Sequence, residues 1–373
     1  MNFRRIASLS IKEFIHLRND WWLPAFMLLG GALELLLIGW ATSRPIANLP
    51  MMVLDHDRSA ASRAFIVALE NTGTFADAEF VYDEDDIRES MDRGNISIAV
   101  IIPPGYGEQI AAGSPSISVI LNGAESVPAT EALRAVEGVA GELGERITLE
   151  RLNLDPDEFE GFIPSMRVWF NETLSEALYT TPAEMGLMLE FTVMLFAALS
   201  FSRERELGTL EQLLVMPYST LELILGKAFP VVIIGFSQFL LMLGMVHVFF
   251  DVPVRGSLIL LLTLALFYIA VELTKGMVIS VIAKTQHQAF LLVMLVGMAD
   301  FMFTGYAAPV ESMPQAVQFA ANFIPAHHWL DIMRGILLKS SGLSVLWPQV
   351  LILAVIGTII ATFSMRYVRR ALN

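Results

Sequence analysis

The chain has 373 residues, of which 55% are hydrophobic, and it carries a formal net charge of −14 without any cysteine. Its mean hydropathy of +0.59 is too high for a water-soluble protein of this size, so the composition excludes an ordinary soluble enzyme or regulator. The lack of cysteine in the sequence also excludes a disulfide framework and a thiolate metal site.

The apolar residues gather in runs of roughly the 20 residues that a helix needs to cross the hydrocarbon core of a bilayer. Six such runs cover residues 23–41, 183–202, 228–250, 257–281, 289–307 and 346–365. The sequence therefore predicts an α-helical polytopic membrane protein with six transmembrane helices. Residues 1–22 have a basic amphipathic pattern. We do not interpret them as the start of a cleaved signal peptide, because the run that follows is too long and lacks a small-x-small cleavage site.

Charge is distributed unevenly along the chain. Residues 43–182 contain 24 acidic residues, nine arginines and no lysine, whereas the remaining residues are nearly neutral. Both terminal flanks are basic, with Arg4, Arg5, Lys12 and Arg18 at the start and Arg366, Arg369 and Arg370 at the end. The positive-inside rule then predicts that both termini are cytoplasmic and that residues 42–182 are periplasmic.

Residues 42–182 also have the pattern of a folded domain. Strand-like stretches at 51–54, 79–82, 96–102 and 117–121 alternate with helical stretches that include 59–69 and 129–152. This alternation predicts an inserted α/β external domain between spans one and two. The sequence Asp55-His56-Asp57 could suggest a metal pair, but we interpret it as the polar end of the first strand, with Asp57 or Ser59 capping the next helix.

The stretch between the second and third apolar runs opens with four alternating charges, Arg203 to Glu206. Leucines then recur at helical spacing, which predicts an amphipathic coupling helix over 203–218 at the membrane surface, ended by Pro217. Ser219 and Glu222 form a capping box that opens the next helix, which continues through Lys227 into the membrane. Such a segment suits the transfer of force from a soluble partner; an ordinary interfacial loop helix is the alternative.

Several ionisable residues fall within the apolar runs, where burial without a partner is costly. We identify Glu34, His247, Glu272, Lys275 and Asp300. Glu272 and Lys275 are one helical turn apart and are expected to neutralise each other. Asp300 has no partner nearby in sequence, so it is our preferred residue for the translocation path or its gate, with Glu272 and Lys275 as further candidates.

Prolines shape two other segments. Thr181-Pro182-Ala183-Glu184 reads as a capping box that starts span two. Pro309, Pro314 and Pro325 divide residues 308–345 into short pieces, which predicts a re-entrant segment in the outer leaflet.

Motifs for independent catalysis are lacking in the sequence. It contains no GxxxxGK[ST] nucleotide-binding motif, no HExxH and no GxSxG. The neighbours His327 and His328 have no companion ligands in the sequence, so we expect no metal there.

The segment from Glu204 to Lys227 resembles the cytoplasmic coupling segment of ABC-2 type exporter permeases, in the branch with a large external domain between the first two spans. Its usual form is E-R-E-x-G-T-x-E-x-L-x-x-x-P, matched here by Glu204, Arg205, Glu206, Gly208, Thr209, Glu211, Leu213 and Pro217. The stretches Pro309–Pro314, Ile324-Pro325 and Arg334-Gly335 are similar to the broken segment before the last span in that family. The stretches Leu54–Ser59, Arg93-Gly94 and Ile102–Gly105 are similar to its external domain.

The resemblance implies a permease subunit in the bacterial inner membrane that moves a drug-like or amphiphilic substrate outward by alternating access. The matched residues would couple it to two cytoplasmic ATPase subunits, which hold ATP and magnesium, while this chain binds no cofactor. A second copy or a sister permease would complete the path through the lipid bilayer. A periplasmic adaptor and an outer-membrane channel are further expected partners, and nucleic acid is not.

Two other functions compete with this interpretation. A membrane-anchored sensor or scaffold would explain the external domain, but not the coupling segment and the four additional spans. An intramembrane enzyme would need paired catalytic groups in the spans, and Glu272 with Asp300 is the one loose candidate.

Overall fold

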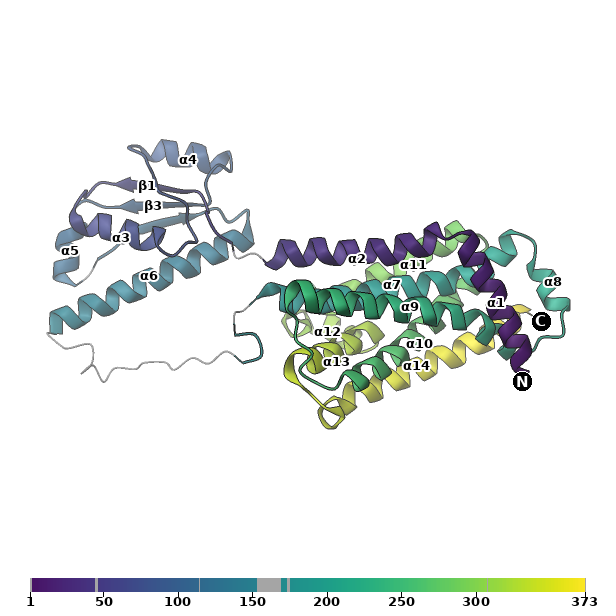
Figure 1. The fold of residues 1–373 in the computed structure, drawn as a ribbon. Coiled ribbons are helices and arrows are strands. Elements are labelled where there is room, and N and C mark those ends of the chain that lie inside the picture. Colours follow the sequence, from purple (N-terminus) through teal and green to yellow (C-terminus); the bar gives the residue numbers. More distant parts are fainter. Residues whose placement is uncertain are drawn as a thin grey trace. The chain divides into compact units, whose positions relative to one another are not determined.

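The computed structural model describes residues 2–43, 46–113, 115–152, 169–172, 175–306 and 308–372. They form two compact units, a helical unit of residues 1–43 with 167–373 and a second unit of residues 44–166. Figure 1 shows that the second unit contains the β-sheet, whose strands follow the first long apolar helix in sequence.

The helical unit begins with α1 (Phe3–Asn19) and α2 (Trp22–Ser43). After the second unit, the chain continues with α7 (Glu176–Glu206), α8 (Leu210–Val215), α9 (Thr220–Phe250), α10 (Leu258–Ile282), α11 (Gln286–Phe303), the 3₁₀ turn η2 (Val310–Ser312), α12 (Gln315–Ala321), α13 (Pro325–Lys339) and α14 (Leu343–Leu372). Among the described residues, six helices are long and apolar enough to cross a membrane: α2, α7, α9, α10, α11 and α14. They coincide with the six predicted runs.

Helix α7 lies at the centre of the helical unit and packs against α2, α9, α10, α11 and α13. The backbones of α7 and α10 come close at Gly276, where a Cβ atom would lie 2.4 Å from the carbonyl oxygen of Met194 in α7. A residue without a side chain lets two helix backbones meet, as is usual between helices inside membranes. Gly276 therefore sets the distance between these two central helices.

Helices α2, α11 and α14 keep large apolar faces exposed, for example at Leu33, Leu295 and Ile359. Soluble monomers rarely expose contiguous apolar surface of this kind. Lipid chains would cover such faces, which agrees with a multi-pass membrane protein.

One predicted helix start is wrong. Helix α7 begins at Glu176, five residues before the Thr181–Glu184 stretch, and Pro182 lies inside it. Proline removes the hydrogen bond that its own N–H would donate, but the surrounding helix continues because both Thr181 and Pro182 are buried in the bundle. The Thr181 hydroxyl donates to the carbonyl of Ala177 at 2.6 Å instead of capping a helix start. Tertiary packing here outweighs the local capping pattern.

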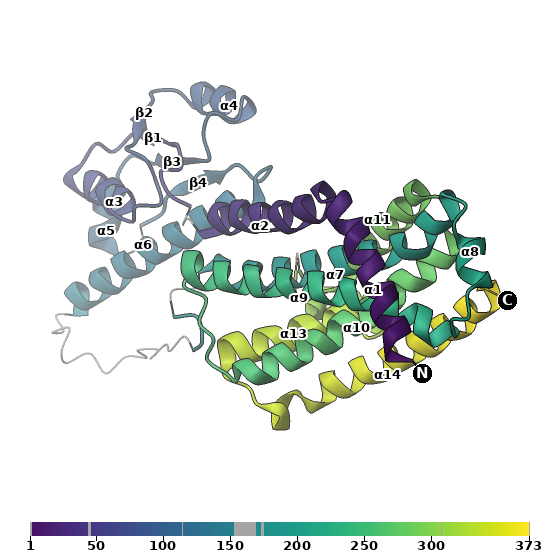
Figure 2. The same ribbon diagram turned by 45° about the vertical axis from the view of Figure 1, so that its right-hand side comes forward.

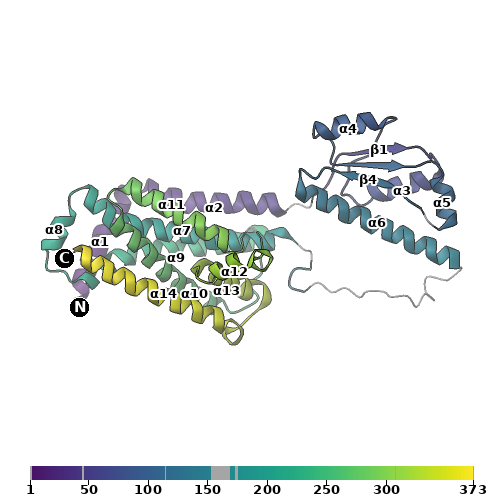
Figure 3. The same ribbon diagram turned by 180° about the vertical axis from the view of Figure 1, so that it is seen from behind.

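Helices α1 and α8 lie at one end of the helical unit and α13 lies towards the other, as Figures 1, 2 and 3 show, and α12 lies beside α13 in Figures 1 and 3. Prolines interrupt the chain at that second end as predicted: Pro309 precedes η2, Pro314 precedes α12, and Pro325 is the first residue of α13. The division of residues 308–345 into short helices is therefore confirmed.

The second unit is built from β1 (Met51–Asp55), α3 (Ala60–Glu70), β2 (Glu79–Phe80), α4 (Glu84–Asp92), β3 (Ile98–Ile102), α5 (Tyr106–Ala112), β4 (Ser118–Leu121) and α6 (Ser126–Leu152). The strand order is β2-β1-β3-β4, with β4 antiparallel to β3 and the other pairs parallel. Val53 faces a core shared with α3 and α6, whereas Met52 and Leu54 face a smaller core with α4. The alternation of side chains along β1 thus supplies both faces of a small α/β layer structure.

The carboxylates of Asp55 and Asp57 accept hydrogen bonds from the chain itself. The Asp57 side chain accepts from the backbone N–H of Gly105 at 2.9 Å and of Gly107 at 3.0 Å, at the start of α5. Asp55 accepts from the hydroxyl of Ser62 at 2.7 Å. The Ser59 hydroxyl and these backbone N–H groups hold the pKa of Asp57 below its ordinary value of 3.8.

This pKa shift predicts a pH dependence for the second unit. Because the folded-state pKa is lowered, ionised Asp57 contributes stability above about pH 4, and that contribution is lost as the pH falls through the folded-state pKa. In the full chain, Asp57→Asn should speed hydrogen exchange at the Gly105 and Gly107 amides at pH 7. Its exchange protection should also change less than that of the native chain when the pH is lowered below 4. The exposed Asp92→Asn is the control, and equal exchange in both variants would contradict the role of Asp57.

The close approach at Gly276 predicts that adding even one methyl group there destabilises the helical unit. Gly276→Ala should lower the free energy of unfolding by about 1–3 kcal/mol, since α7 and α10 must move apart. Gly244→Ala is the matched control, because a Cβ there has no neighbour within 4 Å and alanine favours helix. Thermal unfolding of both variants in detergent micelles tests this difference, and equal midpoints would refute it.

Candidate functional site

The predicted coupling helix over residues 203–218 is divided into two helices. The four alternating charges belong to the last turn of α7, the chain turns at Leu207–Thr209, and only Leu210–Val215 form α8. Gly208 has a φ of +70°, a left-handed conformation that glycine adopts without strain, and it ends α7. The N–H of Thr209 donates to the carbonyl of Glu204 at 2.9 Å, and its hydroxyl contacts the carboxylate of the same residue. Pro217 follows the end of α8, as predicted.

Two of the four charges bind the connection between α10 and α11. The guanidinium of Arg205 donates to the carbonyl oxygens of Val281 and Ala283, at 2.9 Å and 2.6 Å, where α10 ends. The carboxylate of Glu206 accepts from the backbone N–H of Gln286 at 2.7 Å, where α11 begins. Each charge therefore satisfies backbone groups that a helix end leaves without partners.

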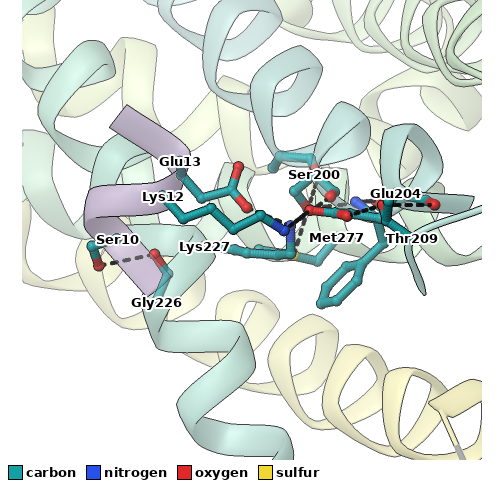
Figure 4. A network of polar contacts seen from close by, with 12 residues as sticks. Ser10, Lys12, Glu13, Ser200, Glu204, Thr209, Gly226, Lys227 and Met277 are labelled. Carbon is teal, nitrogen blue, oxygen red and sulfur yellow. Dashed lines mark hydrogen bonds and ion pairs between the residues drawn. The ribbon is translucent and has the colours of Figure 1, made fainter. Parts of the chain in front are cut away.

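Glu204 is buried at the centre of a second set of contacts (Figure 4). Its Oε1 lies 2.7 Å from the Lys12 ammonium of α1 and 3.3 Å from the Lys227 ammonium of α9. The Lys227 ammonium also lies 2.5 Å from Glu13 and donates to the carbonyl of Ser200 at 2.8 Å. We call Lys12, Glu13, Glu204 and Lys227 the coupling junction. Its two ammonium groups and two carboxylates balance in charge.

Helix α1 is attached to the start of α9 as well. The predicted capping box is confirmed: Ser219 N–H donates to Glu222 at 3.0 Å, and Glu222 N–H donates to the Ser219 hydroxyl at 3.3 Å. The other Glu222 oxygen accepts from the N–H of Asn2 at 2.6 Å. Leu213 of α8 is buried against Leu9 of α1 and Leu223 of α9. The inner side of α8 is thus joined to two helices.

The outer side of α8 and of the turns beside it is exposed and carries both apolar and polar side chains. Val215 exposes 87% of its surface, and Leu207 and Met216 are also exposed. Glu211 is exposed on the same segment. Of the eight residues expected to couple to an ATPase, Glu204, Arg205 and Glu206 bind within the chain, Leu213 is buried, and Glu211 remains available to a partner.

A second charged cluster lies inside the bundle and joins α7, α10 and α11. The Lys275 ammonium lies 2.8 Å from Glu190, 2.8 Å from Glu272 and 2.5 Å from Asp300. The expected pairing of Glu272 with Lys275 is confirmed as an ion pair, although it lies outside hydrogen-bonding geometry. We call these four residues the Lys275 cluster.

The sequence reasoning missed part of this cluster. It found no partner for Asp300, because Lys275 comes from a different helix. It also omitted Glu190 and Glu184, both buried in α7, from the ionisable residues of the spans. Two carboxylates within residues 183–202 were the available signal, since such groups are rare in a span without partners.

The remaining sequence candidates lie apart from the Lys275 cluster. Glu34 is exposed on α2, and the His247 ring lies 3.0 Å from the carbonyl of Val252. The rings of His327 and His328 each contact a backbone carbonyl. Within the described part of the chain, no group of three or more histidine, aspartate or glutamate side chains is arranged to hold a metal ion.

The coupling junction predicts a strong effect of losing Lys227. Lys227→Met should destabilise the helical unit by about 3–5 kcal/mol, because it leaves Glu13 without its ammonium partner and buried Glu204 with Lys12 alone. It should also loosen α1, so that trypsin cleaves faster after Arg4, Arg5 and Lys12. Lys284→Met removes an exposed lysine and is the control. Thermal unfolding and trypsin cleavage rates measure both effects, and native-like values for Lys227→Met would show that the junction does not hold α1.

The sequence is similar to those of known transporter proteins. The family model for the ABC-2 family transporter protein matches residues 21–366. The chain is 26% identical to the probable multidrug ABC transporter permease YbhR of Escherichia coli K12, over 95% of this chain and 97% of that protein. It is also 26% identical to the inner membrane transport permease YhhJ of the same strain, over 100% of this chain and 99% of that protein. With the family model matching nearly the whole length, the chain belongs to the ABC-2 family of transporter proteins.

Proposed function

We propose that this chain is the transmembrane permease subunit of an ATP-driven exporter that moves drug-like or amphiphilic molecules out of the cytoplasm or inner membrane. Membership of the ABC-2 family implies ATP-binding partner subunits. ATP and magnesium would be bound by those subunits. The name of the relative YbhR, a probable multidrug permease, supports the substrate class.

The observation that carries the proposal is the two-sided character of α8 and the turns beside it. Its outer side offers Val215 and Met216 beside the carboxylate of Glu211, a surface suited to a protein partner. Its inner side is fixed to α1 and α9 through Leu213, and the turn before α8 is fixed through Glu204. Movement of a partner on the outer side would therefore be passed to α7 and α9.

We assign the end of the helical unit that carries α1 and α8 to the cytoplasm. The basic residues Arg4, Arg5, Lys12 and Arg18 of α1 support this orientation by the positive-inside rule. The acidic second unit would then be periplasmic, where it could dock an adaptor linked to an outer-membrane channel. A second copy of this chain, or a sister permease, would supply the other half of the path.

Charge reversal at Glu211 tests the docking surface. Glu211→Lys should weaken the complex with a partner ATPase by about tenfold or more, because it replaces an exposed carboxylate of the proposed docking surface by a cation. The ATP hydrolysis rate of the mixture should fall towards that of the ATPase alone. Co-purification and hydrolysis assays measure both effects. Insertion into the membrane should be unchanged, since Glu211 is exposed and no described residue hydrogen-bonds to it.

Glu142→Lys, the same reversal at an exposed position of α6, is the matched control. Native-like complex formation and hydrolysis in Glu211→Lys would remove Glu211 from the interface. Failure of the native chain to bind any candidate ATPase would reject the permease assignment and favour a membrane-anchored sensor or scaffold.

A further inference from the structure

A groove beside the Lys275 cluster has a volume of about 430 Å³. Its walls come from α10, α11, α14 and the residues before α13, and they are formed mainly by aliphatic and aromatic side chains such as Val278, Val296, Ile360 and Phe363. Of the described residues that line it, two are charged, Lys275 and Asp300. The groove is therefore an apolar site with one charged end.

Two members of the Lys275 cluster are accessible from this groove, and two lie behind them. The side chains of Lys275 and Asp300 are 11% and 8% exposed, whereas those of Glu190 and Glu272 are 0% exposed. A molecule in the groove would meet Asp300 and Lys275 first. The carboxylates of Glu190 and Glu272 would act on it through the field that they create at short range.

The Lys275 cluster has more carboxyl groups than ammonium groups. Three carboxylates share one ammonium, whereas the coupling junction has two of each. Glu190 Oε2 and Glu272 Oε1 are buried and have no hydrogen-bond partner among the described residues. A buried carboxyl group without full compensation is costly to ionise, and a positive charge brought beside it lowers that cost, so a cation is favoured there. An anion would find the Lys275 ammonium already surrounded by carboxylates.

We propose that this groove binds a lipophilic cation, an ammonium or phosphonium group carried on an apolar body. The positive group lies next to Asp300, and the apolar body lies along Ile360 and Phe363 of α14 and Val296 of α11. As a statement about the transported substrate, this inference rests on the proposed export function. Binding itself depends only on the groove and on the excess of buried carboxylates.

Tetraphenylphosphonium and tetraphenylborate test the proposal, because they have similar size and shape but opposite charge. Binding is measured by equilibrium dialysis on the full chain with its ATPase in lipid nanodiscs, with empty nanodiscs subtracted. We expect saturable binding of tetraphenylphosphonium and none of tetraphenylborate. Asp300→Asn should weaken phosphonium binding by about tenfold or more, since it removes the accessible carboxylate.

Two further variants separate the charge from the groove. Ile360→Trp fills the apolar wall without changing any charge, and it should also weaken phosphonium binding. Asp251→Asn should leave binding unchanged; Asp251 is exposed at the end of α9 with a φ of +52°, a conformation that asparagine tolerates. Size-exclusion profiles confirm that each variant is folded.

Saturable phosphonium binding that is lost in both Asp300→Asn and Ile360→Trp supports the site. The proposal is overturned if phosphonium does not saturate, if tetraphenylborate binds equally well, or if neither variant changes binding. ATP hydrolysis in the same nanodiscs distinguishes failure of the cation site from failure of the export function. If this chain raises the hydrolysis rate above that of the ATPase alone but phosphonium does not bind, the cation site alone is rejected. If no complex forms between this chain and the ATPase, the export function is rejected.

Discussion

The buried contact of Glu204 with Lys227 and Lys12 is the interaction on which the end of the bundle beneath α8 depends. It joins α7 and α9 to α1, which is far from both in sequence. Removing charges from water is costly, and the contact holds because each member has an opposite charge or a carbonyl within hydrogen-bonding distance. With these helices fixed to one another, the short segment between α7 and α9 has little freedom, and α8 is held with Leu213 inward and with Glu211 and Val215 outward.

The two charged clusters of the bundle differ in their ratio of carboxyl groups to ammonium groups. The coupling junction is neutral and closely paired, as expected for a structural contact between helices. The Lys275 cluster has more carboxylates than ammonium groups and lies beside an apolar groove. A neutral cluster has little to gain from an added ion, whereas an unbalanced one attracts a counter-charge. Their difference in charge thus separates a part that holds helices together from a part that can select a ligand.

Most of the fold could be predicted because its signals are local. Runs of about 20 apolar residues identify spanning helices directly, and alternating strands and helices identify the α/β unit. The capping box at Ser219 depends on residues three positions apart, so its prediction was also accurate. The similar pattern at Thr181 gave a wrong helix start, since continuous burial along α7 outweighed the local preference. The turn at Gly208 was missed because a single glycine between a charged stretch and a leucine-rich stretch does not by itself interrupt a helical period.

The side-chain contacts of the coupling segment and of the Lys275 cluster could not be predicted as completely from the sequence. The eight residues of the coupling segment could be named from their motif, but not the destinations of their side chains, because Glu204, Arg205 and Glu206 reach partners tens or hundreds of positions away. The Lys275 cluster likewise depends on which faces of α7, α10 and α11 meet. Helix packing, and not sequence spacing, decides that Glu190 and Asp300 share one lysine.

The contact of Asp57 with the amides of Gly105 and Gly107 limits what the α/β unit can recognise. In parallel sheets, solutes commonly bind at the carboxyl ends of strands where the strand order reverses, and here that place lies between β1 and β3. Asp57 occupies the backbone donors there as a tethered competitor, whose effective concentration is in the millimolar range or above. A phosphorylated or carboxylated metabolite would have to displace it. Protein surfaces, which can bind elsewhere on the unit, are under no such competition.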